Sequence, residues 1–291
     1  MKVSTEDSNL QLINIYLAYL LDNRGLSKNT LAAYRQDFLH FNNWLHYQQL
    51  SLIAVDSAVI SRYFIWRMTE NFKPSSSARI ASSLKGFYRQ LLIAKKIQLD
   101  PCFGIQFNKY TRPVPAVLSL QEVDKLLAAP DTTTLIGKRD KAMLEFLYAT
   151  GINITELIGL RLSQVDLKKG LVYLDESGVP SRTIPLTDEA IFCLKKYLSS
   201  AGRGAKKQPD IDWIFLSNRE SMMTRQTFWY RMKFYAQQAS ITQKVSPQSL
   251  RIAFAAHLLN NGANLQWVQS ILGHCEVHST QYYSGLVTKL D

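Results

Sequence analysis

Apolar residues recur at helical spacing through the first hundred positions and predict four helices. Ser27 or Asn29 caps the second helix, and the third begins near Ser57. Pro74 then breaks the pattern, and Ser75 opens the fourth helix. Four helices joined by short loops predict a small all-α bundle. Its apolar face is formed by Leu10, Ile13, Tyr16, Leu17, Leu20, Leu21, Leu31, Tyr34, Phe38, Phe41, Leu45, Ile60, Tyr63, Phe64, Ile80, Leu84, Phe87, Leu91 and Leu92.

Residues 100–116 show no periodicity and interrupt this helical pattern. The stretch contains three prolines and two cations, Lys109 and Arg112, and is typical of a linker. We therefore expect two domains, residues 1–99 and residues 117–291, joined by this linker. A chain of 291 residues is long enough for each domain to bury a core of its own.

The second domain mixes helices with short strands. Ser119 and Glu122 have the spacing of a capping box that starts one helix, and Ser246 followed by Pro247 starts another. We therefore predict a mainly α fold with a small β-sheet, an α+β protein. Further helices are expected over residues 142–149, 154–160, 187–198 and 224–239, and strands over residues 171–174, 182–186 and 213–216.

The composition favours a polyanionic partner. Lys and Arg number 34 and Asp and Glu number 23, a formal net charge of +11, and both halves of the chain share the excess. Cations that bind phosphates release counterions, which makes nucleic acid the natural partner of such a chain. A hydrophobic content of 46% with 20% charged residues predicts a folded protein rather than a disordered one.

The three cysteines are scattered along the chain and show neither a disulfide framework nor the spacing of a metal site. We therefore predict no bound metal and no cofactor. The N-terminus lacks an apolar signal core, and no apolar run of 18 residues occurs. These features predict a cytoplasmic protein without a membrane partner.

Basic residues on the expected helix faces are candidates for contacts to DNA. The helix over residues 224–239 turns a polar, basic face outward, which suits a major groove. For any single residue of this kind, an ordinary solvated helix face is the better interpretation. The candidates are Arg35, Arg79, Lys85, Arg112, Arg225, Gln226 and Arg231.

Catalytic candidates lie in the last fifth of the chain, where Arg251, His274 and Tyr283 each stand at the boundary of an element. An arginine and a histidine can hold a phosphate, and a tyrosine hydroxyl can attack it. Tyr282 is adjacent and remains an alternative nucleophile. The opposing interpretation is that the three residues are held only by packing and hydrogen bonds.

Six short motifs carry a resemblance to a known family. They are YRQD at 34–37, SSAR at 76–79, RDKAML at 139–144, YATG at 148–151, MTRQTFW at 223–229 and LGH at 272–274. The chain resembles the tyrosine recombinases, or phage integrases, and the nearest type is the Xer recombinases. The resemblance implies an N-terminal helical core-binding (SAM-like) domain and a C-terminal catalytic domain that close around DNA. It also implies assembly of four subunits on two DNA sites.

In that family a tyrosine attacks a DNA phosphate and forms a 3′-phosphotyrosine link without a metal. Two arginines, two histidines (or a histidine and a tryptophan) and a lysine on a β-hairpin assist the reaction. By this resemblance Tyr283 stands in the place of the nucleophile and Arg251 in that of the second arginine. His274 matches the histidine of the LGH motif, and Glu156 matches an acidic residue that supports the site.

Three positions depart from the family pattern. Asn153 stands where the pattern has an arginine, Gln248 where it has the first histidine, and Ser177 where it has the hairpin lysine. Removing one preorganised donor typically costs about 2.7–4 kcal/mol, so we expect catalysis to be lost or strongly reduced. Xer proteins carry a further helix after the tyrosine, whereas only residues 284–291 follow here, so we expect a weakened contact between subunits.

Three functional hypotheses follow. The first is a DNA-binding Xer-type protein that partners or regulates an active recombinase, with duplex DNA and either that recombinase or further copies of itself as partners. The second is an active site-specific recombinase with substitute residues, Lys168 or Lys169 for the lysine and His257 or His278 for the histidine. For both histidines a core or exposed-turn position is the better interpretation. The third is a transcription factor that reuses the same DNA clamp.

Overall fold

The structure is a computed structural model that describes residues 5–105, 116–175, 181–200 and 212–273. The chain divides into two compact units, Met1–Pro113 and Val114–Asp291, and each is described by itself. It is mainly α-helical with one small β-sheet, as the sequence predicts. The expected linker, residues 100–116, lies largely outside the described residues and stays a prediction. None of the described helices has the length and apolar character that a bilayer span requires.

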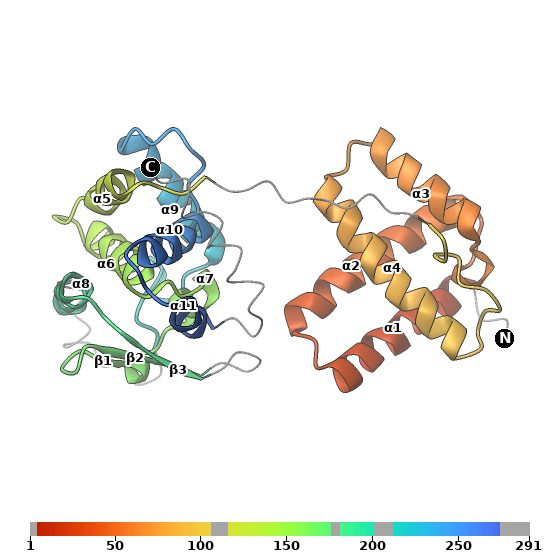
Figure 1. Cartoon of the computed structure of the whole chain (residues 1–291), viewed down its shortest axis with the longest axis horizontal. Helices are drawn as coiled ribbons and strands as arrows, with labels where there is room; N and C mark the ends of the chain where they lie inside the picture. Colours follow the sequence, from red (N-terminus) through yellow and green to blue (C-terminus); the bar gives the residue numbers. More distant parts are fainter. Residues whose placement is uncertain (1–4, 106–115, 176–180, 201–211, 274–291) are drawn as a thin grey trace. The chain divides into compact units, whose positions relative to one another are not determined.

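The four helices predicted for the N-terminal unit are confirmed (Figure 1). Ser27 caps the second by accepting the backbone N–H of Thr30 at 3.2 Å. The predicted break lies just before Pro74, and Pro74 rather than Ser75 is the first residue of the fourth helix, where a missing N–H is no loss. The helices are α1 (Thr5–Arg24), α2 (Lys28–Tyr47), α3 (Ser57–Thr69) and α4 (Pro74–Ile93), with a short 3₁₀ turn, η1 (Leu52–Ala54), before α3.

Aromatic side chains fill the core of this unit. Phe38, Phe41, Tyr63 and Phe87 are all buried, and the ring centroids of Phe38 and Phe87 lie 5.1 Å apart. Side chains of this size bury more apolar area than any others, and tilted or edge-on pairs add to that burial. The predicted apolar stripes meet in one cluster that holds the four helices together, although two of the predicted residues, Leu21 and Leu92, are exposed.

The C-terminal unit is built around α6, which contacts α5, α7, α8 and α10 (Figure 1). Thr134 caps α6, so this helix begins seven residues earlier than the expected residue 142. The helices are α5 (Leu120–Ala128), α6 (Leu135–Thr150), α7 (Ile154–Gly159), α8 (Asp188–Ser200), α9 (Arg225–Gln238), α10 (Pro247–Asn260) and α11 (Leu265–Leu272), with a 3₁₀ turn, η2 (Leu162–Gln164).

The sheet has three antiparallel strands in the order β1 (Val165–Asp166), β2 (Leu171–Leu174) and β3 (Arg182–Pro185). Leu174 pairs with Arg182, so residues 175–181 connect β2 to β3 at one end of the sheet. The connection from β1 lies at its other end. The strand expected over residues 213–216 is wrong, because this stretch forms only isolated bridges, Arg161 to Trp213 and Leu216 to Met222.

A buried carboxylate joins α6 to α9. Asp140 is fully buried, and its Oδ1 accepts a hydrogen bond from Nε of Arg139 at 2.9 Å. Its Oδ2 accepts from Nε of Arg231 at 2.6 Å and from the hydroxyl of Tyr235 at 2.8 Å. Arg139 in turn donates to the carbonyl of Leu216 at 2.9 Å. Removing one partner of such a network leaves the other charges buried and uncompensated.

Replacing this carboxylate, Asp140→Asn, is therefore expected to lower the free energy of unfolding by about 3–5 kcal/mol. Urea denaturation followed by circular dichroism measures the change. The matched control is Asp212→Asn, because Asp212 is partly exposed and lies 4.0 Å from Arg161. That control should cost less than about 1 kcal/mol. Equal losses in both variants would contradict the role given to Asp140.

Candidate functional site

A glycine shapes the corner between α6 and α7. Gly151 ends α6 with a φ of 60°, in the left-handed region. A Cβ at this position would lie 2.2 Å from a ring carbon of Phe254 on α10. Both the backbone conformation and the close approach require glycine. The approach brings the carbonyl of Gly151 against the side chain of Arg251, which also lies on α10.

Two buried arginines bind successive carbonyls at the end of α11. Arg251, which is 6% exposed, donates from Nη2 to the carbonyl of Leu272 at 2.7 Å and from Nη1 to the carbonyl of Gly151. Arg182, at the start of β3, donates from Nε to the carbonyl of Ile271 at 2.6 Å. The last carbonyls of a helix lack partners within the helix. The two guanidinium groups therefore fasten the end of α11 to the strand and to the α6–α7 corner.

Glu156 and Asn153 exchange hydrogen bonds between side chain and backbone at the start of α7. The side chain of Glu156 accepts from Nη2 of Arg182 at 2.7 Å and from the backbone N–H of Asn153 at 2.8 Å. Oδ1 of Asn153 accepts from the backbone N–H groups of Thr155 and Glu156, at 2.8 and 2.9 Å. This reciprocal arrangement is a capping box. The side chain of Asn153 is thereby committed to the first turn of its own helix.

Sequence reasoning missed Arg182 as a residue of this site and treated it only as the start of a strand. The signal was present in the alternation along β3, because Arg182 shares a strand face with Ile184, which is 1% exposed. A charged residue on a buried face needs a partner of opposite charge. The structure supplies that partner in Glu156, the only acidic residue of the short helix α7.

Gln248 lies in the first turn of α10, three residues before Arg251 and on the exposed surface. Among the described residues its side chain makes no hydrogen bond. Its neighbour Ser246 caps the helix by accepting the backbone N–H of Ser249 at 3.1 Å. The rise along a helix places Gln248 about 4.5 Å from Arg251 along the axis. A neutral amide thus stands beside the buried arginine.

Some of the predicted residues lie outside the described ranges. Gly273 ends α11 with a φ of 68°, directly before His274. Their roles stay predictions, which rest on the sequence alone. The residues that lie outside the described ranges are Arg112, Ser177, His274, His278, Tyr282 and Tyr283.

Lys168 and Lys169, the expected substitutes for a hairpin lysine, lie in the turn between β1 and β2. Nζ of Lys169 is 3.8 Å from Asp166. The four residues of β2 separate this turn from residues 175–181, a length of about 13 Å. The two lysines therefore lie at the end of the sheet away from the site.

His257, the other substitute, is buried, and its Nδ1 lies 2.9 Å from the hydroxyl of Tyr148. Burial lowers its pKa. Both side chains line a groove of about 590 Å³ together with Phe254 and Trp267. This position agrees with the interpretation of His257 as a core residue.

Three of the basic candidates are tied to neighbours within the chain. Arg79 pairs with Asp37 at 2.8 Å, Arg35 donates to an asparagine of α1 at 2.7 Å, and Arg231 belongs to the Asp140 network. On the opposite face of α9, Phe228, Met232 and Tyr235 are buried. Contacts of these candidates with DNA stay predictions. The remaining described candidates, all exposed, are Lys85, Arg225 and Gln226.

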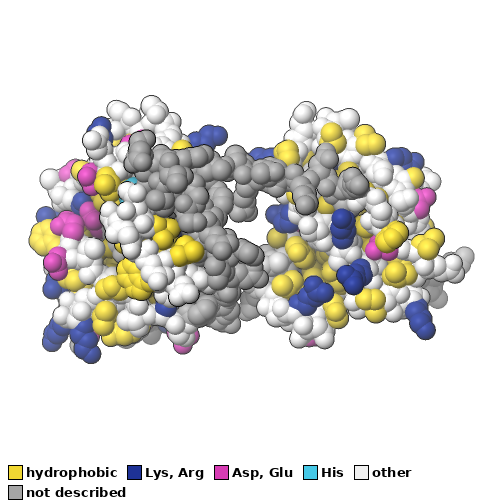
Figure 2. All heavy atoms as spheres, viewed as in Figure 1, with side chains coloured by type: hydrophobic (Ala, Val, Ile, Leu, Met, Phe, Trp, Pro, Cys, Tyr) yellow, Lys and Arg dark blue, Asp and Glu magenta, His cyan; other side chains and the backbone are white. Residues whose placement is uncertain are grey.

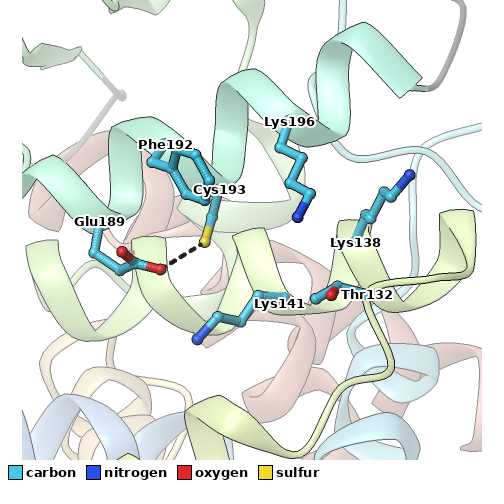
Figure 3. A pocket seen from close by; sticks show the side chains of 7 residues that line it. All are labelled: Thr132, Lys138, Lys141, Glu189, Phe192, Cys193 and Lys196. Atoms are coloured by element: carbon cyan, nitrogen blue, oxygen red, sulfur yellow. Dashed lines mark hydrogen bonds between the residues drawn. The ribbon is translucent and has the colours of Figure 1, made fainter.

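A second hollow, of about 180 Å³, lies between α6 and α8 (Figure 3). The thiol of Cys193 donates to Glu189 at 3.2 Å, and burial together with this bond raises its pKa to about 12. The thiol is therefore protonated near neutral pH and is not a nucleophile.

Lys138 of this hollow precedes Gly151 by thirteen residues on α6, about 20 Å along the helix axis. The hollow is separate from the α6–α7 corner. It is lined by Thr132, Lys138, Lys141, Glu189, Phe192, Cys193 and Lys196.

Among the described residues, Glu145, Glu189 and Cys193 have ligand atoms within 4.8 Å of one another, a spacing that could hold a metal ion. Nζ of Lys141 lies 2.6 Å from Glu145 and already neutralises that carboxylate. A metal would have to displace this ammonium group and deprotonate a thiol whose pKa is about 12. The arrangement fits an ion pair with a hydrogen-bonded thiol better than a metal centre.

Two family profiles match the chain. The phage integrase family matches residues 116–288, and the phage integrase N-terminal SAM-like domain matches residues 13–95. Tyrosine recombinase XerD of Shewanella oneidensis is 45% identical over 273 residues, which cover 94% of this chain and 91% of that protein. Tyrosine recombinase XerD of Pseudomonas putida is 41% identical over 273 residues, covering 94% and 92%.

Solved structures share the fold. The XerH site-specific recombinase bound to a palindromic difH substrate matches with a TM-score of 0.78 at 18% identity, covering 99% of this chain and 95% of that one. The Tn1549 transposon integrase in complex with circular intermediate DNA matches with a TM-score of 0.75 at 17% identity, covering 94% of each chain. At these identities the likeness concerns the fold alone.

The catalytic-domain profile spans more than half of the chain, and the two XerD relatives are more than 40% identical over almost all of it. The predicted resemblance is thereby confirmed. The chain belongs to the phage integrase family and is an Xer-type tyrosine recombinase by descent.

Proposed function

We propose that this chain is a DNA-binding Xer-type homologue whose own strand cleavage is lost or strongly reduced. It occupies a recombination-type site on duplex DNA and partners or regulates an active Xer-type recombinase, or assembles there with further copies of itself. A protein with this role works in the cytoplasm and needs no metal or cofactor for it.

DNA binding is supported by charge and by kinship. The formal net charge is +11, and Figure 2 shows Lys and Arg side chains gathered on the visible face of the N-terminal unit. The similar XerH and Tn1549 proteins were solved with DNA bound. Phosphate contacts made by such cations give affinity that does not depend on base sequence.

One observation carries the loss of cleavage, namely the position of Asn153. The side-chain oxygen Oδ1 of Asn153 accepts hydrogen bonds from two backbone N–H groups of α7, so the side chain serves as a helix cap. An arginine would offer a permanent charge and a fork of donors to a phosphate. The capping asparagine offers neither, because its oxygen is engaged and its amide is neutral.

Two further positions deepen this loss. The exposed Gln248 brings at most a neutral donor, and the serine at position 177 has no acidity near neutral pH with which to protonate a leaving oxygen. Each missing preorganised donor costs about 2.7–4 kcal/mol, although the effects within one site do not add. By the resemblance, Arg251 and Glu156 match residues of the family site, which supports continued binding of a phosphate.

An active recombinase with substitute residues is the second candidate, and Arg182 is the observation that favours it. Its guanidinium group and that of Arg251 bind adjacent carbonyls of α11, so two cations still converge on this corner. Arg182 is however paired with Glu156 at 2.7 Å, which neutralises it. This pairing is the reason to prefer the first candidate.

A covalent-adduct assay on nicked DNA tests the loss of cleavage. The purified chain is incubated with a nicked Xer-site duplex and separated on a denaturing gel, because a nick lets the leaving fragment diffuse away and traps the intermediate. We expect binding in a mobility-shift assay and no adduct, while an active Xer-type recombinase on the same duplex forms one. An adduct that disappears in Tyr283→Phe would overturn the proposal in favour of the second candidate.

Restoring the three family residues together, Asn153→Arg with Ser177→Lys and Gln248→His, should produce an adduct at least about 100-fold above the parent chain. The loss of the Asn153 cap should cost about 1 kcal/mol of stability, which thermal unfolding checks. The control is the same triple variant with Tyr283→Phe, which must stay silent. A folded, DNA-bound triple variant without any adduct would show that activity was lost elsewhere.

A further inference from the structure

Arg67 on α3 is a buried cation whose partners are all neutral. The residue is 4% exposed. Nε donates to the hydroxyl of Ser77 at 3.1 Å, and Nη1 donates to the hydroxyl of Tyr63 at 3.2 Å and to Nδ1 of His40 at 3.4 Å. The ring of Phe72 lies 4.4 Å from the guanidinium carbon. Among the described residues Arg67 has no carboxylate partner, and its Nη2 makes no hydrogen bond.

Such a cation is costly unless a negative charge compensates it. Moving a charge away from water costs several kcal/mol, and buried charges in proteins are therefore paired. Aromatic faces and neutral acceptors return only part of this cost. Asp37, a buried carboxylate of the neighbouring helix α2, is engaged by both arms of Arg79, at 2.8 and 2.9 Å. Among the described residues, Arg67 therefore has no carboxylate of its own.

The start of α4 lies beside this cation, because Ser77 in its first turns accepts the hydrogen bond from Nε of Arg67. The helix is 20 residues long, its N-cap is Lys73, no side chain caps it, and its first turn contains no acidic residue. The N-terminus of a helix carries a partial positive charge, which favours anions. In α4, Pro74 has no N–H and the N–H groups of Ser76 and Ser77 bond the carbonyl of Lys73, which leaves the N–H of Ser75 in this turn. Ser77, the fourth residue of α4, accepts a hydrogen bond from Arg67, so the guanidinium lies next to the helix start.

We propose that Arg67, together with the first turn of α4, binds one phosphate group of a DNA backbone. The inference deepens the proposed function and rests on it. Nη2 is the donor left for the phosphate, while Nε and Nη1 hold the guanidinium in place through Ser77, Tyr63 and His40. An arginine fixed in this way loses little side-chain entropy on binding, in contrast to an exposed lysine.

The neighbouring His40 supplies an internal reporter. Its Nδ1 accepts from Arg67 and from the hydroxyl of Tyr63 at 2.8 Å, so the proton of the neutral ring sits on Nε2. Burial lowers the pKa of His40, Arg67 lowers it further, and Asp37 opposes both. A phosphate on Arg67 adds a negative charge to this group and must raise the pKa of His40. A purely structural Arg67 would leave that pKa unchanged when DNA binds.

The first test measures the salt dependence of binding to a random-sequence duplex of about 30 base pairs, because a backbone contact does not depend on sequence. Arg67→Gln should weaken binding roughly tenfold at low salt and reduce the slope of log K against log salt by about 0.9, the value of one phosphate. Arg62→Gln is the matched control, since it removes the same charge from an exposed position of the same helix. It should leave the slope unchanged.

The second test needs no variant of Arg67 and decides the matter if Arg67→Gln does not fold. The full chain is titrated by NMR with and without the duplex, and the His40 signal is assigned with His40→Gln. We expect the duplex to raise the midpoint of His40 by at least about one pH unit, because at an effective dielectric constant of about 20 a unit charge about 12 Å away already produces that shift. An unchanged midpoint overturns the assignment of Arg67.

The outcomes separate the two proposals. A chain that does not bind the duplex overturns the proposed function and the phosphate site together. A chain that binds, with a slope that Arg67→Gln leaves unchanged, keeps the proposed function and overturns only the site at Arg67. Equal loss of slope in Arg67→Gln and Arg62→Gln would assign the effect to net charge and would also overturn the site.

Discussion

Hydrogen bonds from two arginines to successive carbonyls hold the end of α11 against β3 and the α6–α7 corner, where the candidate site lies. Arg251 joins the end of α11 to the α6–α7 corner, and Arg182 joins the next carbonyl to β3 and Glu156. Each guanidinium satisfies helix-end carbonyls that have no partner within their own helix. Because both guanidinium groups are buried, they fix the position of the end of α11.

Positive charge in excess of its local partners recurs in both units. In the C-terminal unit the single carboxylate of Asp140 is shared by Arg139 and Arg231. In the N-terminal unit Asp37 serves Arg79, while Arg67 is held by hydroxyl, imidazole and aromatic groups. A fold that buries cations without matching anions accumulates electrostatic cost, which a polyanion bound at the surface would relieve. Part of the positive charge that gives the chain its net charge of +11 is therefore buried, and the rest lies on the surface.

Local helix chemistry and catalysis compete at position 153. An asparagine at the N-cap stabilises α7 by about 1 kcal/mol through its two bonds to the backbone. The same bonds turn the side chain toward its own helix, where it has nothing to offer a phosphate. A residue that serves a short helix in this way supports a protein that keeps its fold and its binding surface after cleavage has been given up.

By itself, the sequence predicted most of the helices of both units, the capping box at Ser119, the helix start at Ser246 and the small sheet, because periodicity and caps are local signals. It did not predict α11 (Leu265–Leu272). Its motifs carried the resemblance to the family, and that resemblance assigned Arg251 and Glu156 to one site. Only the tertiary structure decided that Arg182 completes that site, that residues 213–216 form isolated bridges, and that Lys168 lies at the far end of the sheet. It alone showed Arg67 buried without a carboxylate. The reason is physical: a charge is paired or unpaired according to which distant segments pack against it, and neither spacing nor composition contains that information.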